Sequence, residues 1–297
     1  MNLDYLKAFY TTVNCNSISK ASKLLHITQP ALSMQIQHLE NELNATLLIR
    51  SNKGVELTEE GKIVFEHAES MLSLEKNILK NLNELKKDKQ LLNICACKYI
   101  GEYVLPCSIY TFKEIHPDID VKLNVDNTTQ IISKILNHEI NLGVIAGINE
   151  IEDIISTPIL SDKIVLITKE EENIDIKNTA DILRIPIILN EYDLDDSSML
   201  NLRLSKCGLS VSDLNIILTS NSPESIKSVV MSGKGFAFLP KITVKKELRK
   251  NLLKEIPIDD IDMSFKYYFA QRNDYVLQMH EQIFKSFITS KKRCFCY

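Results

Sequence analysis

The sequence lacks several features that define large classes of proteins. No apolar run approaches the roughly 20 residues that a membrane-spanning helix needs, so no membrane segment is expected. The first residues, Met1–Tyr5, contain an acid and no apolar core, which is not the pattern of a secretory signal. Only 8 glycines and 8 prolines occur in 297 residues, and no low-complexity segment or short repeat is visible, which excludes collagen-like and disordered chains.

Signatures of catalysis and metal binding are also missing. The sequence has no nucleophile elbow, no P-loop, no dinucleotide-binding glycine motif, and no His-x-x-x-His or Cys-x-x-Cys spacing. The six histidines stand far apart along the chain, which favours surface or capping roles. We therefore expect no catalytic residues, no metal site and no cofactor, although an enzyme built on the C-terminal region stays an alternative.

The charge balance is uneven along an otherwise ordinary globular composition, 44% hydrophobic and 25% charged. Residues 1–89 hold 11 basic and 11 acidic residues, so the whole net charge of −4 falls on residues 90–297. A nucleic-acid-binding unit near the N-terminus would need to present its cations on one face.

Residues 1–57 have the pattern of short helices followed by a hairpin. Ser17 and Thr28 are placed to cap the second and third helices, and Pro30 falls in a first turn, where its missing N–H costs nothing. A strand, a Gly-containing turn and a second strand follow within residues 47–57. This order predicts a winged helix-turn-helix. Apolar residues recur at helical spacing in three groups: Leu3, Leu6, Phe9 and Val13; Ile18, Ala21, Leu24 and Leu25; and Leu32, Ile36, Leu39 and Leu43.

One long helix is predicted over residues 58–89. Apolar residues in it step by four and three, which is a heptad seam interrupted by Glu75. The seam predicts a helix that pairs between protomers, and packing on its own domain is the alternative. Its positions are Val64, Ala68, Met71, Glu75, Ile78, Leu82 and Leu85.

Residues 90–297 alternate between short Ile/Val-rich runs and helical patterns. Continuous apolar strands that alternate with helices predict parallel-rich α/β sheets covered on both faces. The expected strands are 91–97, 121–125, 142–146, 164–168, 185–189, 216–219, 236–239 and 267–270. The expected helices are 104–115, 131–136, 199–207, 225–231, 242–248 and 276–288.

The most specific pattern lies in Ser17–Glu40, which contains Thr28-Gln29-Pro30-Ala31-Leu32-Ser33, followed by Leu47–Arg50 and Leu57–Gly61. It closely resembles the LysR-type transcriptional regulators, and the resemblance extends over nearly all 297 residues. It implies a winged helix-turn-helix at 1–57, a linker and dimerisation helix at 58–89, and a periplasmic-binding-protein-like effector domain at 90–297. Two α/β lobes are expected in this domain, lobe I at 91–161 and 266–297 and lobe II at 162–265.

The third helix is expected to read DNA. Gln29, Ser33 and Gln35 lie on the face opposite its apolar residues, and amide or hydroxyl groups can bond base edges or phosphates. Arg50 and Lys53 flank or occupy the wing turn and suit backbone contact. Met34 stands where relatives often have Arg, and Ser22 where they have a small apolar Ala. The expected DNA-binding residues are Ser17, Lys20, Thr28, Gln29, Pro30, Ser33, Met34, Gln35, Arg50 and Lys53.

The resemblance also implies an effector cleft between the lobes, lined by loops at strand ends and helix starts. Thr128, Thr129 and Ser222 precede helices, where free N–H groups bind anions, although capping alone would explain them. Acids replace the usual Ser-Gly-Thr-Arg pattern within residues 191–199, which disfavours a strongly anionic effector unless Lys98 compensates. The expected effector residues are Cys97, Lys98, Tyr99, Thr128, Thr129, Ala146, Asp196, Ser197 and Ser222.

The seven cysteines, an odd number, favour reduced thiols in the cytoplasm. Buried, inert thiols are expected at Cys15, Cys95, Cys107 and Cys207. A thiol-based redox-sensing regulator that uses Cys97 is one alternative function, and a solute-binding module is another. The family resemblance implies operator DNA, a small-molecule effector and RNA polymerase as partners, with a homodimer that assembles to a homotetramer and no membrane.

Overall fold

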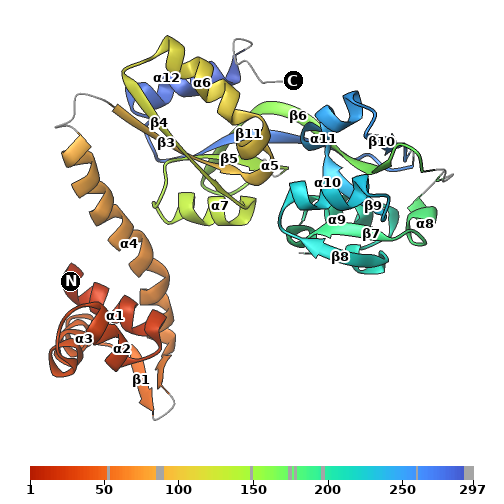
Figure 1. The fold of residues 1–297 in the computed structure, drawn as a ribbon. Coiled ribbons are helices and arrows are strands. Elements are labelled where there is room, and N and C mark those ends of the chain that lie inside the picture. The colour runs from red at the N-terminus through yellow and green to blue at the C-terminus, as the bar shows by residue number, and fades with distance from the viewer. Residues whose placement is uncertain are drawn as a thin grey trace. The chain divides into compact units, whose positions relative to one another are not determined.

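The computed structural model describes residues 1–51, 54–84, 90–147, 150–172, 176, 179–194, 198–258 and 260–290. It divides into two compact units, one formed by residues 1–87 with 136–139 and the other by 88–135 with 140–297 (Figure 1). In the described part of the chain, no helix combines the length and the hydropathy that crossing a membrane requires.

The first unit contains three helices, a hairpin and one long helix, in the predicted order. The two strands pair antiparallel, with Arg50 opposite Val55. The predicted winged helix-turn-helix is therefore confirmed, and the two cap predictions hold, because Ser17 accepts from the N–H of Lys20 and Thr28 from that of Ala31. The elements are α1 Leu3–Cys15, α2 Ile18–Leu24, α3 Gln29–Leu43, β1 Leu48–Ser51, β2 Gly54–Leu57 and α4 Glu59–Glu84.

A small apolar core holds these helices together. It includes Leu6 and Phe9 of α1 and Leu32, Ile36 and Leu39 of α3, all essentially inaccessible to water. Two positions of the predicted apolar faces are wrong. Leu24 is 65% exposed and Leu43 is 37% exposed, because each lies at the C-terminal end of its helix, beyond the reach of the core.

The start of α4 is fastened to the base of the hairpin. Thr58 donates its hydroxyl to the carbonyl of Thr46 at 2.6 Å and its N–H to that of Leu47 at 3.1 Å. A Cβ on Gly61 would lie 2.1 Å from the Leu47 carbonyl oxygen, so only glycine allows this approach. The contact fixes the direction in which α4 leaves the hairpin.

Much of the predicted seam on α4 is exposed in the single chain. Ala68 is buried within the unit, whereas Ile78 is 60% and Leu82 53% exposed. Leu85, the last predicted position, lies outside the described residues. Leu79 is also exposed, at 58%, and lies beside a stripe of exposed apolar residues along one side of the helix: Ile63, Met71, Leu74, Ile78 and Leu82.

The second unit is a mixed α/β domain. Each predicted strand and helix has a counterpart, although β6 begins ten residues earlier than expected, and α5, α8 and β10 were not predicted. The strands are β3 Gln90–Cys97, β4 Ile119–Asp126, β5 Leu142–Ala146, β6 Ile154–Lys169, β7 Ile187–Asn190, β8 Ile216–Ser220, β9 Phe236–Pro240, β10 Leu253–Ile256 and β11 Ser264–Arg272. The helices are α5 Lys98–Tyr103, α6 Leu105–Ile115, α7 Thr128–Leu136, α8 Thr179–Ile182, α9 Met199–Leu204, α10 Pro223–Met231, α11 Lys241–Arg249 and α12 Met279–Thr289.

The strands follow the order β4-β3-β5-β11-β6-β9-β7-β8, with β10 attached to β6 (Figure 1). The outer strands pair parallel, as predicted, but β11 pairs antiparallel with β5 and β6, and β6 with β9. The expectation of parallel-rich sheets is therefore wrong at the centre. The first half of β6, residues 154–163, pairs with β11, and residues 164–167 pair with β9, so the chain changes neighbours at the lobe boundary expected near residue 161.

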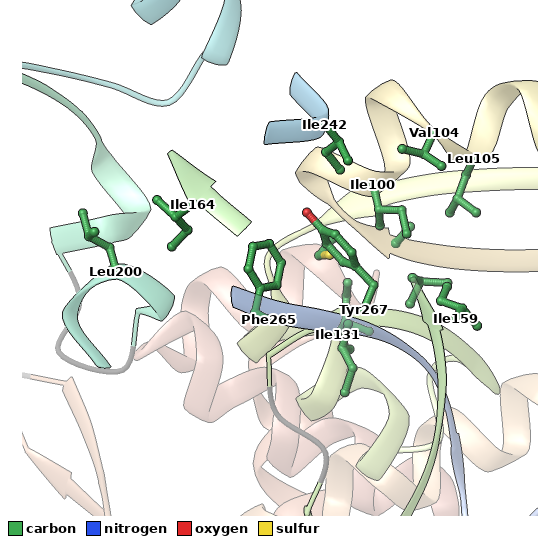
Figure 2. Packing of buried hydrophobic residues seen from close by; sticks show 14 of the residues in the cluster. Ile100, Val104, Leu105, Ile131, Ile159, Ile164, Leu200, Ile242, Phe265 and Tyr267 are labelled. Atoms are coloured by element: carbon green, nitrogen blue, oxygen red, sulfur yellow. The ribbon is translucent and has the colours of Figure 1, made fainter. Parts of the chain in front are cut away.

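The packed interior of this unit includes side chains of α5, α7 and β11. Figure 2 shows Tyr267 of β11 among Ile100 of α5 and Ile131 of α7, which belong to the same buried cluster. Its ring lies 5.0 Å from that of Phe265.

The exposed stripe on α4 generates a prediction about assembly. Replacing Ile78 and Leu82 together by Asp should place charges in a buried seam and convert dimers into monomers in sedimentation velocity. Lys76→Asp is the control, because Lys76 is exposed on the other side of the same helix and its variant should keep the wild-type oligomer. An unchanged oligomer in the double variant would show that α4 does not pair protomers.

Candidate DNA-reading helix and ligand cleft

The outer face of α3 presents polar side chains close to its start. Gln29 is exposed, and its amide donates to the hydroxyl of Ser19 on α2 at 3.4 Å. Pro30 is exposed, Met34 is 58% exposed, and Ser33 and Gln35 are half-buried on the same helix. The opposite face of α3 is the buried one, so this surface is available to a groove of DNA.

The remaining predicted DNA-binding residues surround this helix. Ser17 and Thr28 act as helix caps, so the hydroxyl oxygen of each already accepts one backbone N–H. Lys20 is exposed on α2. The backbone of Arg50 lies in β1 opposite Val55. Lys53 lies outside the described residues.

A cavity of about 550 Å³ opens in the second unit where several strands end. Its walls come from the end of β3 and start of α5, the end of β4 and start of α7, the end of β7, and β9. A cavity of this size holds a small metabolite. Six predicted effector residues line it: Cys97, Lys98, Tyr99, Thr128, Thr129 and Ala146.

The three predicted hydroxyl groups at helix starts have different surroundings. Thr128 accepts from the N–H of Ala146 at 3.3 Å, while Asn127 caps α7 by accepting from the N–H of Gln130 at 2.7 Å. Thr129 is exposed in the cavity wall. Ser222 caps α10, with Ser225 N–H donating at 3.3 Å, and it is absent from the lining of this cavity. The capping interpretation therefore accounts for Ser222.

Lys98 and Tyr99 connect α5 to the end of β7. The Lys98 ammonium donates to the carbonyl of Asn221 and lies 5.6 Å from the centre of the Tyr192 ring. Asn190, which is 1% exposed, donates to the Tyr99 hydroxyl at 2.8 Å. The sequence analysis did not predict Asn190 and Tyr192 as site residues. They directly follow the apolar run 187–189, so the rule that ligands bind beyond the ends of strands would have selected them.

Asp193 is a further lining residue that was not predicted for the site. Partial removal from water raises the pKa of its carboxyl to about 7, and no described residue opposes this with a hydrogen bond or a positive charge. Asp196 and Ser197, which were predicted, lie outside the described residues. The sequence indicated the acidic segment but not which of its carboxyl groups faces the cavity.

The cysteines differ from the expected set of buried thiols. Cys95 and Cys97 are buried, and burial raises the pKa of the Cys97 thiol to about 12, which keeps it protonated and unreactive. The prediction is wrong for Cys207, which is exposed, and for Cys107, which is disulfide-bonded. Cys15 is half-buried.

Two family models match the chain. The model described as "Bacterial regulatory helix-turn-helix protein, lysR family" matches residues 3–62, and that of the "LysR substrate binding domain" matches residues 86–292. With a DNA-binding head and a ligand-binding α/β domain, the protein is a DNA-binding transcriptional regulator with a substrate-binding domain. The chain belongs to the LysR family.

Similar proteins agree with this assignment. "Probable RuBisCO transcriptional regulator" of Trieres chinensis is 31% identical over 271 residues, covering 88% of this chain and 87% of the relative. The protein of the same description from Emiliania huxleyi is 32% identical and covers 87% and 85%. Among solved structures, the LysR family regulator CbnR has a TM-score of 0.66 at 18% identity, with 97% and 98% covered. A full-length OxyR variant from Pseudomonas aeruginosa gives 0.60 at 19%, with 99% and 98% covered.

The face of α3 generates a prediction about base readout. Gln29→Ala should weaken binding to the specific operator by roughly 1–3 kcal/mol and leave binding to random DNA nearly unchanged, because an amide can form two bonds to adenine. Gln37→Ala, an exposed glutamine two turns further along the same helix, is the matched control. Gel-shift titrations at fixed salt measure both. Equal losses on operator and random DNA would remove Gln29 from base readout.

The raised pKa of Asp193 generates a prediction about stability. Below pH 3.8, the usual pKa of the group, the carboxyl is protonated in both the folded and the unfolded state and does not lower the free energy of unfolding. As the pH rises toward its folded-state pKa of about 7, only the unfolded state loses the proton readily, and the free energy of unfolding falls. Asp193→Asn should therefore raise the free energy of unfolding at pH 8 by about 2 kcal/mol after allowance for partial exposure, and by less than half of this at pH 5. Urea unfolding measures it. Asp213→Asn is the control and should give no gain, since Ser210 holds the pKa of that carboxyl below its usual value.

Proposed function

We propose that this regulator reads a pseudo-palindromic operator with α3 and responds to a small polar metabolite bound in the cleft at the strand ends. The observation that carries the proposal is the cavity of about 550 Å³. It lies where ligands bind in open α/β sheets, in a chain that also has a DNA-binding head.

DNA recognition is assigned to the face of α3 and to the wing. Gln29, Ser33 and Gln35 read bases or phosphates, with Pro30 and Met34 packing beside them. Ser17, Lys20 and Thr28 support the start of the helix at the phosphates, and Arg50 and Lys53 contact the backbone or the minor groove. The exposure of Gln29 and Met34 supports this assignment.

The effector is proposed to bind between lobe I, residues 91–161 and 266–297, and lobe II, residues 162–265. Cys97, Lys98, Tyr99, Thr128, Thr129 and Ala146 contribute from lobe I. Asp196, Ser197 and Ser222 complete the set predicted from lobe II, and Ser222 acts through the α10 start that it caps. Closure on the ligand shifts the population of two states, which requires unequal affinity for them.

The chain is proposed to act as a homodimer that assembles to a homotetramer, with α4 as the pairing helix and the α/β domains as the second contact. Its place is the cytoplasm, where operator DNA and RNA polymerase are available. We propose no enzymatic activity for it, because its two domains match models of a transcriptional regulator family. Among the described residues, no group of three or more His, Cys, Asp or Glu has the arrangement of a metal site.

A thiol-based redox regulator is the second candidate. The similarity to OxyR is one of fold, and Cys97 lies at the cavity wall. The protonated state of this buried thiol opposes the role, because the thiolate is the reactive species. A solute-binding module without DNA binding is disfavoured by the complete winged helix-turn-helix.

The cleft generates a prediction about the response. Thr129→Ala should abolish the effector response and preserve operator binding by the ligand-free protein, since Thr129 is an exposed residue of the cavity wall. A thermal-shift screen of metabolites supplies an inducer, and a reporter fused to the bound promoter measures induction. Gln130→Ala, the exposed neighbour on α7, is the control. Normal induction in Thr129→Ala would contradict the assignment of this cleft as the effector site. Loss of a peroxide response in Cys97→Ser would support the redox alternative.

A further inference from the structure

The lining of the cleft carries more acid than base. In the described lining, four residues are acidic, Glu102, Asp126, Glu191 and Asp193, and one is basic, Lys98. Asp126 is neutralised by Lys134, whose ammonium lies 2.5 Å from its carboxylate. An excess of negative charge therefore faces the cavity, which disfavours an anionic ligand and favours a cationic one.

Lys98 does not neutralise Asp193. Its ammonium is directed to the Asn221 carbonyl and to the Tyr192 ring. Desolvation raises the pKa of Asp193, and neither Lys98 nor another described cation opposes it. Lys98, the one basic residue in the described part of the lining, is thus directed elsewhere.

The Asp193 carboxylate itself lacks a partner among the described residues. Its backbone carbonyl accepts from the Ser198 hydroxyl at 3.1 Å, but neither carboxylate oxygen takes part in a hydrogen bond or ion pair there. A half-buried carboxylate that lacks a partner among the described residues is unfavourable, and a cation bound beside it would remove that cost.

The surroundings of Asp193 suit an alkylammonium group. Tyr192, next to it in the chain, contributes an aromatic face that already accepts one ammonium, that of Lys98. Apolar side chains complete the lining and suit the hydrocarbon part of a ligand: Ile164, Met199, Phe238, Pro240 and Phe265.

We propose that the effector is a small metabolite with a protonated primary amine, and that this amine forms an ion pair with Asp193 in the cleft. The inference rests on the proposed function, since it names the ligand class of the same cleft. Asp193 is the specificity-determining residue, and Glu191 contributes only to the surrounding field.

The test uses purified full-length protein at pH 8 and three pairs of probes that differ in one group. The pairs are putrescine with 1,4-butanediol, 4-aminobutanoate with 4-hydroxybutanoate, and glucosamine with glucose, and succinate is added as an anionic probe. Thermal shift and calorimetry measure binding to the wild type, to Asp193→Asn and to Glu191→Gln. The glutamine variant is the matched control, because it removes a neighbouring acid from the same lining.

We expect at least one amine to bind tenfold or more tightly than its hydroxyl counterpart, a loss of tenfold or more in Asp193→Asn, and a change of less than threefold in Glu191→Gln. The inference is overturned if succinate binds more tightly than every amine, if amine and hydroxyl probes bind equally, if Asp193→Asn binds amines as well as the wild type, or if no amine binds at 10 mM. The thermal melt of each variant without ligand reports whether it is folded.

A gel shift with the operator, run on the same samples, separates this inference from the proposed function. Operator binding together with preference for succinate would leave a ligand-controlled regulator with a different effector class. Failure to bind any operator would contradict the DNA-reading role while the amine result still decides the inference.

Discussion

The antiparallel pairing of β6 with β11 is the constraint on which the ligand-binding unit depends. β6 pairs with β11 through its first half and then with β9 and β10, so this central strand joins the two halves of the sheet order. The side chains of Phe265, Tyr267 and Phe269 on β11 are buried in the core of the α/β unit. Because the two halves of the sheet meet at β11 and β6, strand ends from distant parts of the sequence come together around the cavity.

Local signals made the DNA-binding head predictable. Ser17 and Thr28 are caps whose effect extends over three residues, and the buried positions of α3 follow from a period of 3.6 residues. The strands of the second unit were found because each is a short apolar run. The order of those strands was not predictable in the same way, since pairing depends on contacts between residues more than a hundred positions apart, such as Phe269 with Thr157.

The cleft was predictable in its location and not in its chemistry. Strand ends and helix starts selected Lys98, Thr128 and Thr129, and all three line the cavity. The same reasoning chose Ser222, whose hydroxyl caps α10, because a cap and a ligand contact have identical sequence signatures. It passed over Asp193, since the burial and isolation of a carboxylate are properties of the folded chain, and three acids within four residues look alike in the sequence.

Gly61 has a mechanical consequence for the DNA-binding head. Its close approach to the Leu47 carbonyl, with the two hydrogen bonds of Thr58, joins the hairpin and the first turn of α4 into one rigid piece. The 26 residues of α4 form an arm about 39 Å long at 1.5 Å per residue. A tilt of about 5° at one end of an arm of this length moves the other end by roughly 3 Å, close to the rise of one base pair. A side chain at position 61 would push the first turn of α4 away from the Leu47 carbonyl and loosen the contact between them. Small rotations of α4 would then no longer be transmitted fully to the DNA-binding head.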